Sequence, residues 1–472
     1  MFRFNRKKIQ IFNIFAVPIM FVIWIFELFD LQKSESVYRA GMILPIAFVI
    51  GYVFFTIVRK YYILDIHLII LLLFFVKMYV FPLLVIYCGR FNIAKYNLSL
   101  LYNVFDAILV QLLEWCSVVV ALCFIRVDTR EKYQFSREID DDVNRKVWRV
   151  IFLCVFIIII ASIIYPSLLY KFRPIFFSSE TQEILWKQNS TIAVSSINGI
   201  IYYPINWLII VTRLSFVYLM VIRIWKKREY KSESISILVS FLIIAIGLVL
   251  IVPDDVAASI IAAFCLLSLM TKLYPTKSKR ILFIVMVVSA LFFIYVFFGK
   301  AFVKDASIED SLLLLSQRLN AYFSGYINMA AVPDMKCNDK LGYFMGDFFR
   351  SFPVIKGFFI NMPTSTELFN ATLGYDAIYN SQIIPLEGQA YFYFGYVGVL
   401  IVPFLVVKLC MKFYNKMLVA TGTYGFFIYC FYSLILAFGV VMYDGFLIFY
   451  ICLSYVPLLI INSFINRREV AI

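Results

Sequence analysis

The residues best suited to chemistry lie in a polar segment near position 320. In the stretch Ser316–Asn328, Arg318, Tyr322 and Gly325 recur at i, i+4 and i+7, a spacing that places them on one face of a helix. An arginine matches phosphate oxygens bidentately, a tyrosine offers a sugar a stacking face and a hydroxyl, and a glycine permits close approach. The pattern indicates an anion site with a sugar-binding edge. The alternative is a packed helix with Arg318 in solvent.

A second segment of interest is Gln382–Gly398, in which a polar stretch runs directly into an apolar one. Glu387 and Gly388 precede a series of tyrosines and phenylalanines that contains Gly395 and Gly398. Small residues permit close helix contact in a membrane, and tyrosines are typical of the membrane interface. We therefore expect Glu387 at the mouth of a membrane-spanning helix.

Four charged residues fall inside apolar runs: Lys77, Asp106, Glu114 and Arg213. Charges at such depth are costly and usually face a cavity or a partner. Asp106 and Glu114 are eight residues apart and therefore share a helix face, while Arg213 is deep enough to need a counter-ion. A structural ion pair between helices and a functional role are equally good interpretations.

The scarcity of histidine restricts the chemistry further. The chain has one histidine, His67, which we interpret as an interfacial or buried polar residue. This argues against Ser-His-Asp or Cys-His catalysis and against histidine-based metal sites. No phosphate-binding loop of the nucleotide-hydrolase type is present either. We expect no metal and no cofactor.

The elements that hold these residues follow from composition. Of 472 residues, 63% are hydrophobic and 15% are charged, and the mean hydropathy is +0.89, far from the average soluble domain. Runs of about 20 apolar residues, the length that crosses a bilayer, predict an all-α polytopic membrane protein with about twelve transmembrane helices. These lie at about 10–30, 39–58, 62–88, 98–125, 147–168, 198–222, 234–253, 255–271, 281–299, 389–407, 420–442 and 445–465.

The positive charges predict the orientation. With a cytoplasmic N-terminus, most of the 43 lysines and arginines fall on the cytoplasmic side, as membrane proteins prefer. The formal charge of +14 therefore suits a membrane surface, and no nucleic-acid partner is expected. Both termini are predicted to be cytoplasmic, with nine helices in 1–299, a large extracytoplasmic loop over 300–388 and three helices in 389–472. From Ile308 to Tyr326, apolar residues three or four apart predict an amphipathic helix.

Taken together, the chain resembles the Wzy-type oligosaccharide repeat-unit polymerases of bacterial O-antigen and capsule assembly. The resemblance rests on the whole-chain plan, a dozen spans with a large outer loop before the tenth, and on two local patterns. One is Arg318 followed by Tyr322-Phe-Ser-Gly325-Tyr-Ile-Asn328. The other is Glu387-Gly-Gln-Ala-Tyr-Phe-Tyr-Phe-Gly395-Tyr-Val-Gly398.

The resemblance implies a glycosyltransferase of the bacterial cytoplasmic (inner or plasma) membrane that needs no metal or nucleotide sugar. It would transfer a growing glycan from undecaprenyl pyrophosphate to a new lipid-linked repeat unit at the outer face. The implied partners are the undecaprenyl-pyrophosphate-linked oligosaccharide and the lipid bilayer, with a chain-length regulator and a flippase as further candidates. The product could be capsule, exopolysaccharide or O-antigen.

Such families rely on external arginines. The matching candidates here are Arg318 and Arg350 in the large loop, Arg173 in a smaller outer segment over 170–198, and Arg213 one span further on. Tyr322 would contact the sugar, and preorganised arginines would stabilise the departing pyrophosphate.

The acceptor hydroxyl needs a base, for which Glu387 is the first choice, with Asp376 and Asp254 behind it. The sequence lacks a clear repeat of one arginine motif in both outer segments, a pattern of some members of the family.

Three other functions fit parts of the sequence. A lipid-linked oligosaccharide flippase has a similar helix count, but the large loop of about 90 residues argues against it. An O-antigen ligase shares the plan but uses an external histidine, whereas His67 is predicted near the cytoplasmic side. A secondary transporter is supported by the intramembrane charges Asp106, Glu114 and Arg213.

Overall fold

The computed structural model describes residues 4–5, 15–26, 36–59, 62–63, 65–89, 91, 101–126, 137–164, 196–227, 232–250, 256–293, 307–374, 382–420 and 422–466. Within these ranges the regular secondary structure is helical apart from one short antiparallel pair, β1 (Phe4–Asn5) with β2 (Tyr62–Ile63). Predicted candidates Arg173, Asp254 and Asp376 lie outside the described residues.

The first half of the chain contributes an apolar helix over Phe15–Phe26 and a series of helices of different lengths. These are α2 Ser36–Arg39, η2 Ala40–Met42, α3 Ile43–Val58, α4 Asp65–Phe75, the π-helical turn η3 Val76–Val80, α5 Phe81–Cys88, α6 Leu101–Phe124, α7 Arg137–Ile164, α10 Ser196–Lys226, α11 Glu233–Ile244, the π-helical turn η6 Ala245–Leu250, α12 Val256–Leu273, η7 Pro275–Lys277 and α13 Ser278–Phe293.

In the second half, a series of helices of at most 16 residues precedes two long helices, α18 and α19, and two shorter ones follow. These are α14 Ile308–Phe323, α15 Tyr326–Ala330, η9 Val332–Asp334, α16 Lys340–Arg350, η10 Lys356–Phe359, α17 Ser365–Thr372, α18 Leu386–Leu418, α19 Gly422–Met442, α20 Gly445–Ser454 and α21 Val456–Asn466.

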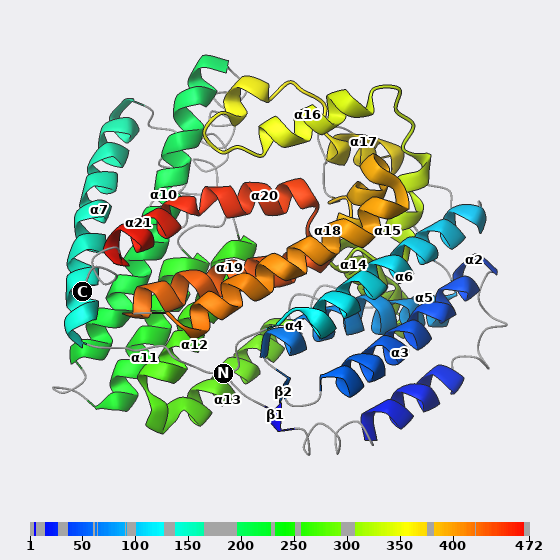
Figure 1. The fold of residues 1–472 in the computed structure, drawn as a ribbon, viewed down its shortest axis with the longest axis horizontal. Helices are drawn as coiled ribbons and strands as arrows, with labels where there is room; N and C mark the ends of the chain where they lie inside the picture. The colour runs from blue at the N-terminus through cyan, green and yellow to red at the C-terminus, as the bar shows by residue number, and fades with distance from the viewer. Residues whose placement is uncertain are drawn as a thin grey trace.

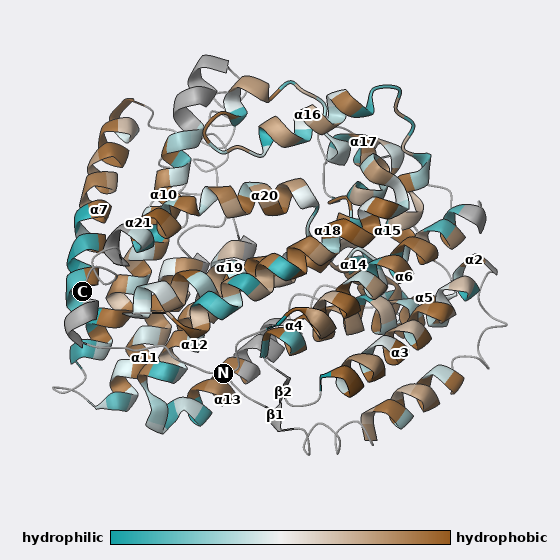
Figure 2. Ribbon diagram, in the orientation of Figure 1, coloured by the Kyte–Doolittle hydropathy of each residue, from teal (hydrophilic) through white to brown (hydrophobic). Residues whose placement is uncertain are grey.

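The helical membrane class predicted from composition is confirmed. Among the described residues, seven helices are long and apolar enough to cross a membrane, and two bent pairs raise the number to nine. The predicted total of twelve stays a prediction, because two further apolar helices, Phe15–Phe26 and Glu233–Leu248, are shorter than a full span. The C-terminal half of α7 is apolar (Figure 2), and most of its side chains are exposed, as expected for a surface solvated by lipid.

Helix α18 crosses the middle of the view in Figure 1 and packs against α19 and α6. It begins at Leu386, directly after Pro385, a residue whose fixed φ suits a helix start. Glu387 therefore lies in the first turn of the helix rather than in the preceding loop, as the predicted boundary at 389 had it. At Gly395, a φ of 61° and a ψ of −154° break the helix into two segments, a conformation that favours glycine.

The segment between α13 and α18 packs onto the bundle. Helix α14 contacts α5 and η3, α15 contacts α6, and η10 contacts α10. The predicted amphipathic helix is confirmed as α14, which Ser307 caps by accepting a hydrogen bond from the backbone N–H of Asp310.

The helix ends at Phe323, however. The expectation that Gly325 shares a helical face with Arg318 is therefore wrong, because Ser324 adopts a left-handed conformation and Gly325 precedes α15.

Candidate functional site

An aromatic cavity lies where α16, α18 and α20 meet. Its volume is about 290 Å³. The wall combines apolar rings with two polar side chains, Gln389 and Tyr393. The lining residues are Phe348, Leu386, Gln389, Ala390, Tyr393, Phe394, Val402, Gly445, Phe446 and Phe449. Phe394 and Phe449 are also exposed, so the cavity opens at the surface of the bundle. It suits a ligand with an apolar or ring-shaped part.

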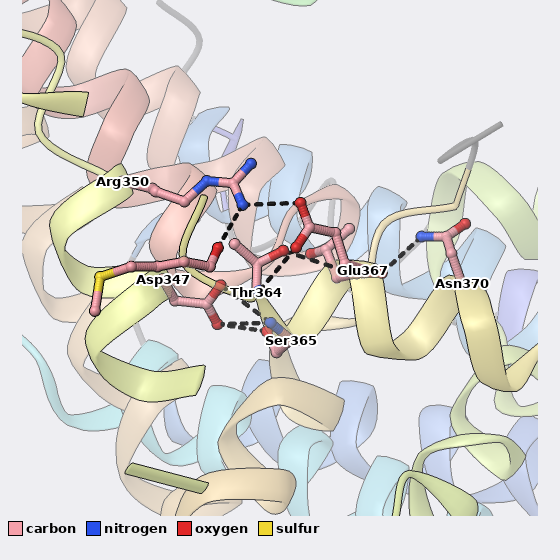
Figure 3. A network of polar contacts seen from close by, with 8 residues as sticks. Asp347, Arg350, Thr364, Ser365, Glu367 and Asn370 are labelled. Atoms are coloured by element: carbon pink, nitrogen blue, oxygen red, sulfur yellow. Dashed lines mark hydrogen bonds and ion pairs between the residues drawn. The ribbon is translucent and has the colours of Figure 1, made fainter. Parts of the chain in front are cut away.

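Asp347 lies beside this cavity, buried on α16. Its carboxylate accepts hydrogen bonds from the Ser365 hydroxyl at 2.5 Å, the Tyr393 hydroxyl at 2.6 Å and the Gln389 amide at 3.3 Å. It also faces the backbone N–H of Ser365 at the start of α17 (Figure 3), where a helix N-terminus favours negative charge. Burial raises the pKa of Asp347, and these hydrogen bonds oppose the rise. Tyr393 thus connects a buried carboxylate to the cavity.

Arg350 follows Asp347 by one turn of α16. Its guanidinium donates to Glu367 Oε1 and to the Met362 carbonyl, both at 2.8 Å, as Figure 3 shows. Glu367 also closes a capping box with Thr364 at the start of α17. The arginine is therefore fixed by the loop between α16 and α17, and its side chain remains 20% exposed.

Lys356 adds a second cation close to Arg350. Its ammonium lies 4.7 Å from the ring centroid of Tyr450 on α20 and 5.6 Å from that of Tyr203 on α10. Burial, assisted by the charge of Arg350, lowers the pKa of Lys356 to about 8. Arg350 is already paired with Glu367, so it is Lys356, held against two aromatic faces, whose charge a bound anion would stabilise.

A second buried carboxyl, Asp444, caps α20 by accepting a hydrogen bond of 2.7 Å from the N–H of Leu447. Burial raises the pKa of Asp444 to about 7, with a smaller contribution from the charge of Asp347. Gln389 links the two carboxyl regions, because its amide donates to Asp347 while its carbonyl accepts from the N–H of Phe446.

The sequence-predicted residues are divided among different parts of the fold. Arg350 belongs to the region of the cavity. Arg318, partly buried, and Tyr322, 50% exposed, lie on α14, which packs against α5 and η3. Arg213 on α10 donates to the Ser259 hydroxyl at 2.9 Å. The three predicted arginines within the described residues thus lie on three different helices, α10, α14 and α16.

Glu387 is held in the interior of the bundle. Lys77 bonds Glu387 at 2.8 Å and Glu114 at 2.7 Å, and all three side chains are fully buried. Of the two interpretations of the intramembrane charges, the ion pair between helices is therefore present for Lys77 and Glu114. Asp106, the other carboxyl of α6, is partly exposed and accepts a hydrogen bond from Tyr396. His67 is fully buried against the ring of Phe55.

Sequence reasoning missed Asp347 and Lys356. One signal was available for Asp347, since it precedes Arg350 by three residues and the two share a helix face. Nothing in the sequence around Lys356 distinguishes it from other lysines, because its surroundings come from α10 and α20, far away in the chain.

No family model, curated protein or solved structure matches this chain. In the described ranges, no three His, Cys, Asp or Glu side chains are grouped so that they could hold a metal ion. Fold and site together define a class, a multi-pass helical membrane protein with a polar and aromatic site at the edge of its bundle.

Proposed function

We propose that this protein is a glycosyltransferase that polymerises lipid-linked oligosaccharide repeat units at the outer face of a bacterial cytoplasmic membrane. The observation that supports the proposal best is the grouping around the aromatic cavity. A carboxylate, Asp347, adjoins the cavity, and two cations, Arg350 and Lys356, lie nearby on the same segment. A substrate with an isoprenoid chain, a diphosphate and sugar rings has parts that suit each of these features.

In the proposed reaction a hydroxyl oxygen of the acceptor sugar attacks the anomeric carbon of the growing glycan. The bond from that carbon to the phosphate oxygen breaks, and undecaprenyl pyrophosphate leaves. Arg350 and Lys356 would compensate the negative charge that accumulates on the diphosphate. Asp347 would take the proton of the attacking hydroxyl through Tyr393, whose hydroxyl already donates to it.

The other candidates keep different roles in this proposal. Arg318 and Tyr322, on α14, would bind a more distant part of the glycan or its carrier. Glu387 would position α18, because Lys77 already bonds its carboxylate. Arg173, Arg213 and Asp376 remain candidates for substrate binding by the resemblance.

The test is incorporation of lipid-linked repeat units into a ladder by the purified protein in lipid nanodiscs. We expect polymer from the wild type and none from Asp347→Asn or Arg350→Ala. Asp339→Asn is the matched control, since Asp339 lies at the other end of α16, where it caps the helix. Absence of any ladder from a folded wild type would contradict the proposal, and normal ladders from both variants would remove these residues from the mechanism.

A secondary transporter is the second candidate, and the buried Lys77 cluster favours it. Charged residues inside a bundle often mark ion pathways. Uptake of a labelled solute into proteoliposomes, driven by an ion gradient and lost in Glu114→Gln, would support transport. A flippase is distinguished in cells, because loss of a flippase removes single repeat units from the outer face and loss of a polymerase does not.

A further inference from the structure

The cluster of Lys77, Glu114 and Glu387 joins three separate elements inside the bundle. Lys77 comes from the π-helical turn η3, Glu114 from the middle of α6 and Glu387 from the first turn of α18. Each of the three side chains is fully buried. None of the three residues lines the aromatic cavity, and none touches the substrate in the reaction proposed for it.

The formal charges in this cluster do not balance. One lysine faces two glutamates, which leaves one negative charge in the interior of an apolar bundle. A buried charge is very costly unless another charge compensates it. Helices α3, α15 and α19, which pack against these elements, contain no acidic or basic residue. Of the other elements packed on η3, α14 carries Arg318, which is partly exposed, together with Glu309 and Asp310, and α4 carries Asp65 and His67.

Two oxygen atoms indicate how the charge is balanced. Lys77 donates to Glu114 Oε2 and Glu387 Oε1. Among the described residues, the other two oxygens, Glu114 Oε1 and Glu387 Oε2, have no hydrogen-bond partner although both are buried. The two carboxyl groups are neighbours, because each is bonded to the same ammonium nitrogen, at 2.7 Å for Glu114 and 2.8 Å for Glu387. A buried oxygen without a partner costs free energy, so the site lacks one positive charge and one hydrogen-bond donor.

We propose that the cluster binds one proton, shared between Glu114 and Glu387. A single proton supplies the missing charge and bridges the two oxygens that lack partners. Glu387 would remain the carboxylate, because it lies at the N-terminus of α18, where the helix dipole favours negative charge. Glu114, in the middle of α6, would be the carboxylic acid and donate to Glu387. The proton holds η3, α6 and the start of α18 together.

The binding of a proton on folding has a defined consequence for stability. In the unfolded chain a glutamate releases its proton near pH 4.3. Folding therefore takes up one proton at neutral pH, and the unfolded-to-folded ratio rises about tenfold for each unit of increasing pH. A glutamine at position 114 imitates the protonated acid, because its amide can donate to Glu387 and its carbonyl can accept from Lys77. This variant is expected to fold and to lose that part of the pH dependence.

Infrared spectroscopy of the purified protein in nanodiscs tests the proposal directly. At about pH 9, above the pKa of about 7 of Asp444, the wild type should show a carboxylic-acid C=O band that shifts in D2O. The band should disappear in Glu114→Gln and in Glu387→Gln. It should persist in Asp106→Asn, which removes a partly exposed carboxyl from the same helix α6, and in Asp444→Asn.

A wild-type spectrum without an acid band would overturn the proposal, as would a band that both glutamine variants retain. If neither variant folds, the wild-type spectrum alone still decides whether an acid is present above pH 8. Sodium is the competing occupant. Saturable binding of sodium-22 that is lost in Glu114→Gln, without an acid band, would assign the site to a metal cation instead. Failure of the polymerisation assay would leave this result unaffected.

Discussion

Replacement of Lys356 by methionine should have opposite effects on two properties: it should increase the stability of the ligand-free protein and weaken the binding of an anion. The ordinary pKa of 10.5 falls to about 8 on burial, which corresponds to a cost of roughly 3 kcal/mol for keeping the ammonium charged in the folded protein. The contacts with the Tyr450 and Tyr203 rings return about 0.5–2 kcal/mol, and partial exposure reduces the cost further. Lys356→Met should therefore stabilise the ligand-free protein by about 1–2 kcal/mol.

The same change should weaken binding of a diphosphate. A hydrogen bond to a charged group contributes about 1.5–3 kcal/mol, so the affinity for polyprenyl diphosphate should fall by about 10- to 100-fold. A bound anion would also stabilise the charged form of Lys356. The residue that destabilises the ligand-free protein is therefore the one that increases its affinity for an anion. Binding can be measured by isothermal titration with the protein in nanodiscs.

The pH profile supplies an independent check. The unfolded chain keeps the Lys356 proton up to about pH 10.5, whereas the folded protein loses it at about pH 8. Because the unfolded state binds more protons in this range, the stability of the wild type should rise from pH 8 towards pH 10.5. Lys356→Met should lack this rise.

Unfolding in mixed micelles, followed by fluorescence, measures both effects. Lys340→Met is the control, because Lys340 donates to the Phe392 carbonyl at 3.0 Å and its loss should lower stability without changing diphosphate affinity. If Lys356→Met were destabilised by 1 kcal/mol or more with an unchanged pH profile, the reasoning would be refuted, because the ammonium would then be well satisfied by the protein itself.

Three further predictions concern stability. Gly325→Ala should destabilise the protein by about 1–3 kcal/mol, because the added Cβ would lie 2.2 Å from the Phe81 ring; an unchanged melting temperature would contradict the observed packing. Thr364→Ala, which removes the capping box of α17, should cost about 0.5–2 kcal/mol in chemical unfolding. Asp444, with its pKa raised to about 7, should lower stability as pH rises from about 4 to 7, and Asp444→Asn should flatten that profile.

Apolar periodicity sufficed for the helical class because each span is determined locally. Ile308 opens α14 as predicted, and the runs before Val58 and Phe124 are helices in the structure. The end of α14 was missed because the sequence from Arg318 to Gly325 keeps a helical spacing. Its termination depends on one left-handed residue, Ser324, whose type does not require that conformation.

The spacing of residues along the chain could not predict which side chains from distant segments contact each other in the folded protein. Glu114 and Lys77 were recognised as charges at depth, but the bond from Lys77 to Glu387 joins positions 310 residues apart along the chain. Asp347 likewise depends on Ser365, Gln389 and Tyr393, whose approach is set by the packing of α17 and α18. A pattern along one segment contains no information about which distant helix will face it.

The break at Gly395 makes Leu386–Phe394 a short rod with its own direction. Glu387 stands near one end of this rod and Tyr393 near the other, so the buried charge cluster and the cavity carboxylate are both attached to it. If this segment tilts so that Glu387 moves away from Lys77, the Tyr393 hydroxyl must also move relative to Asp347. The joint itself has open space where a Cβ would be, so the left-handed backbone, rather than crowding, restricts which residues can replace this glycine.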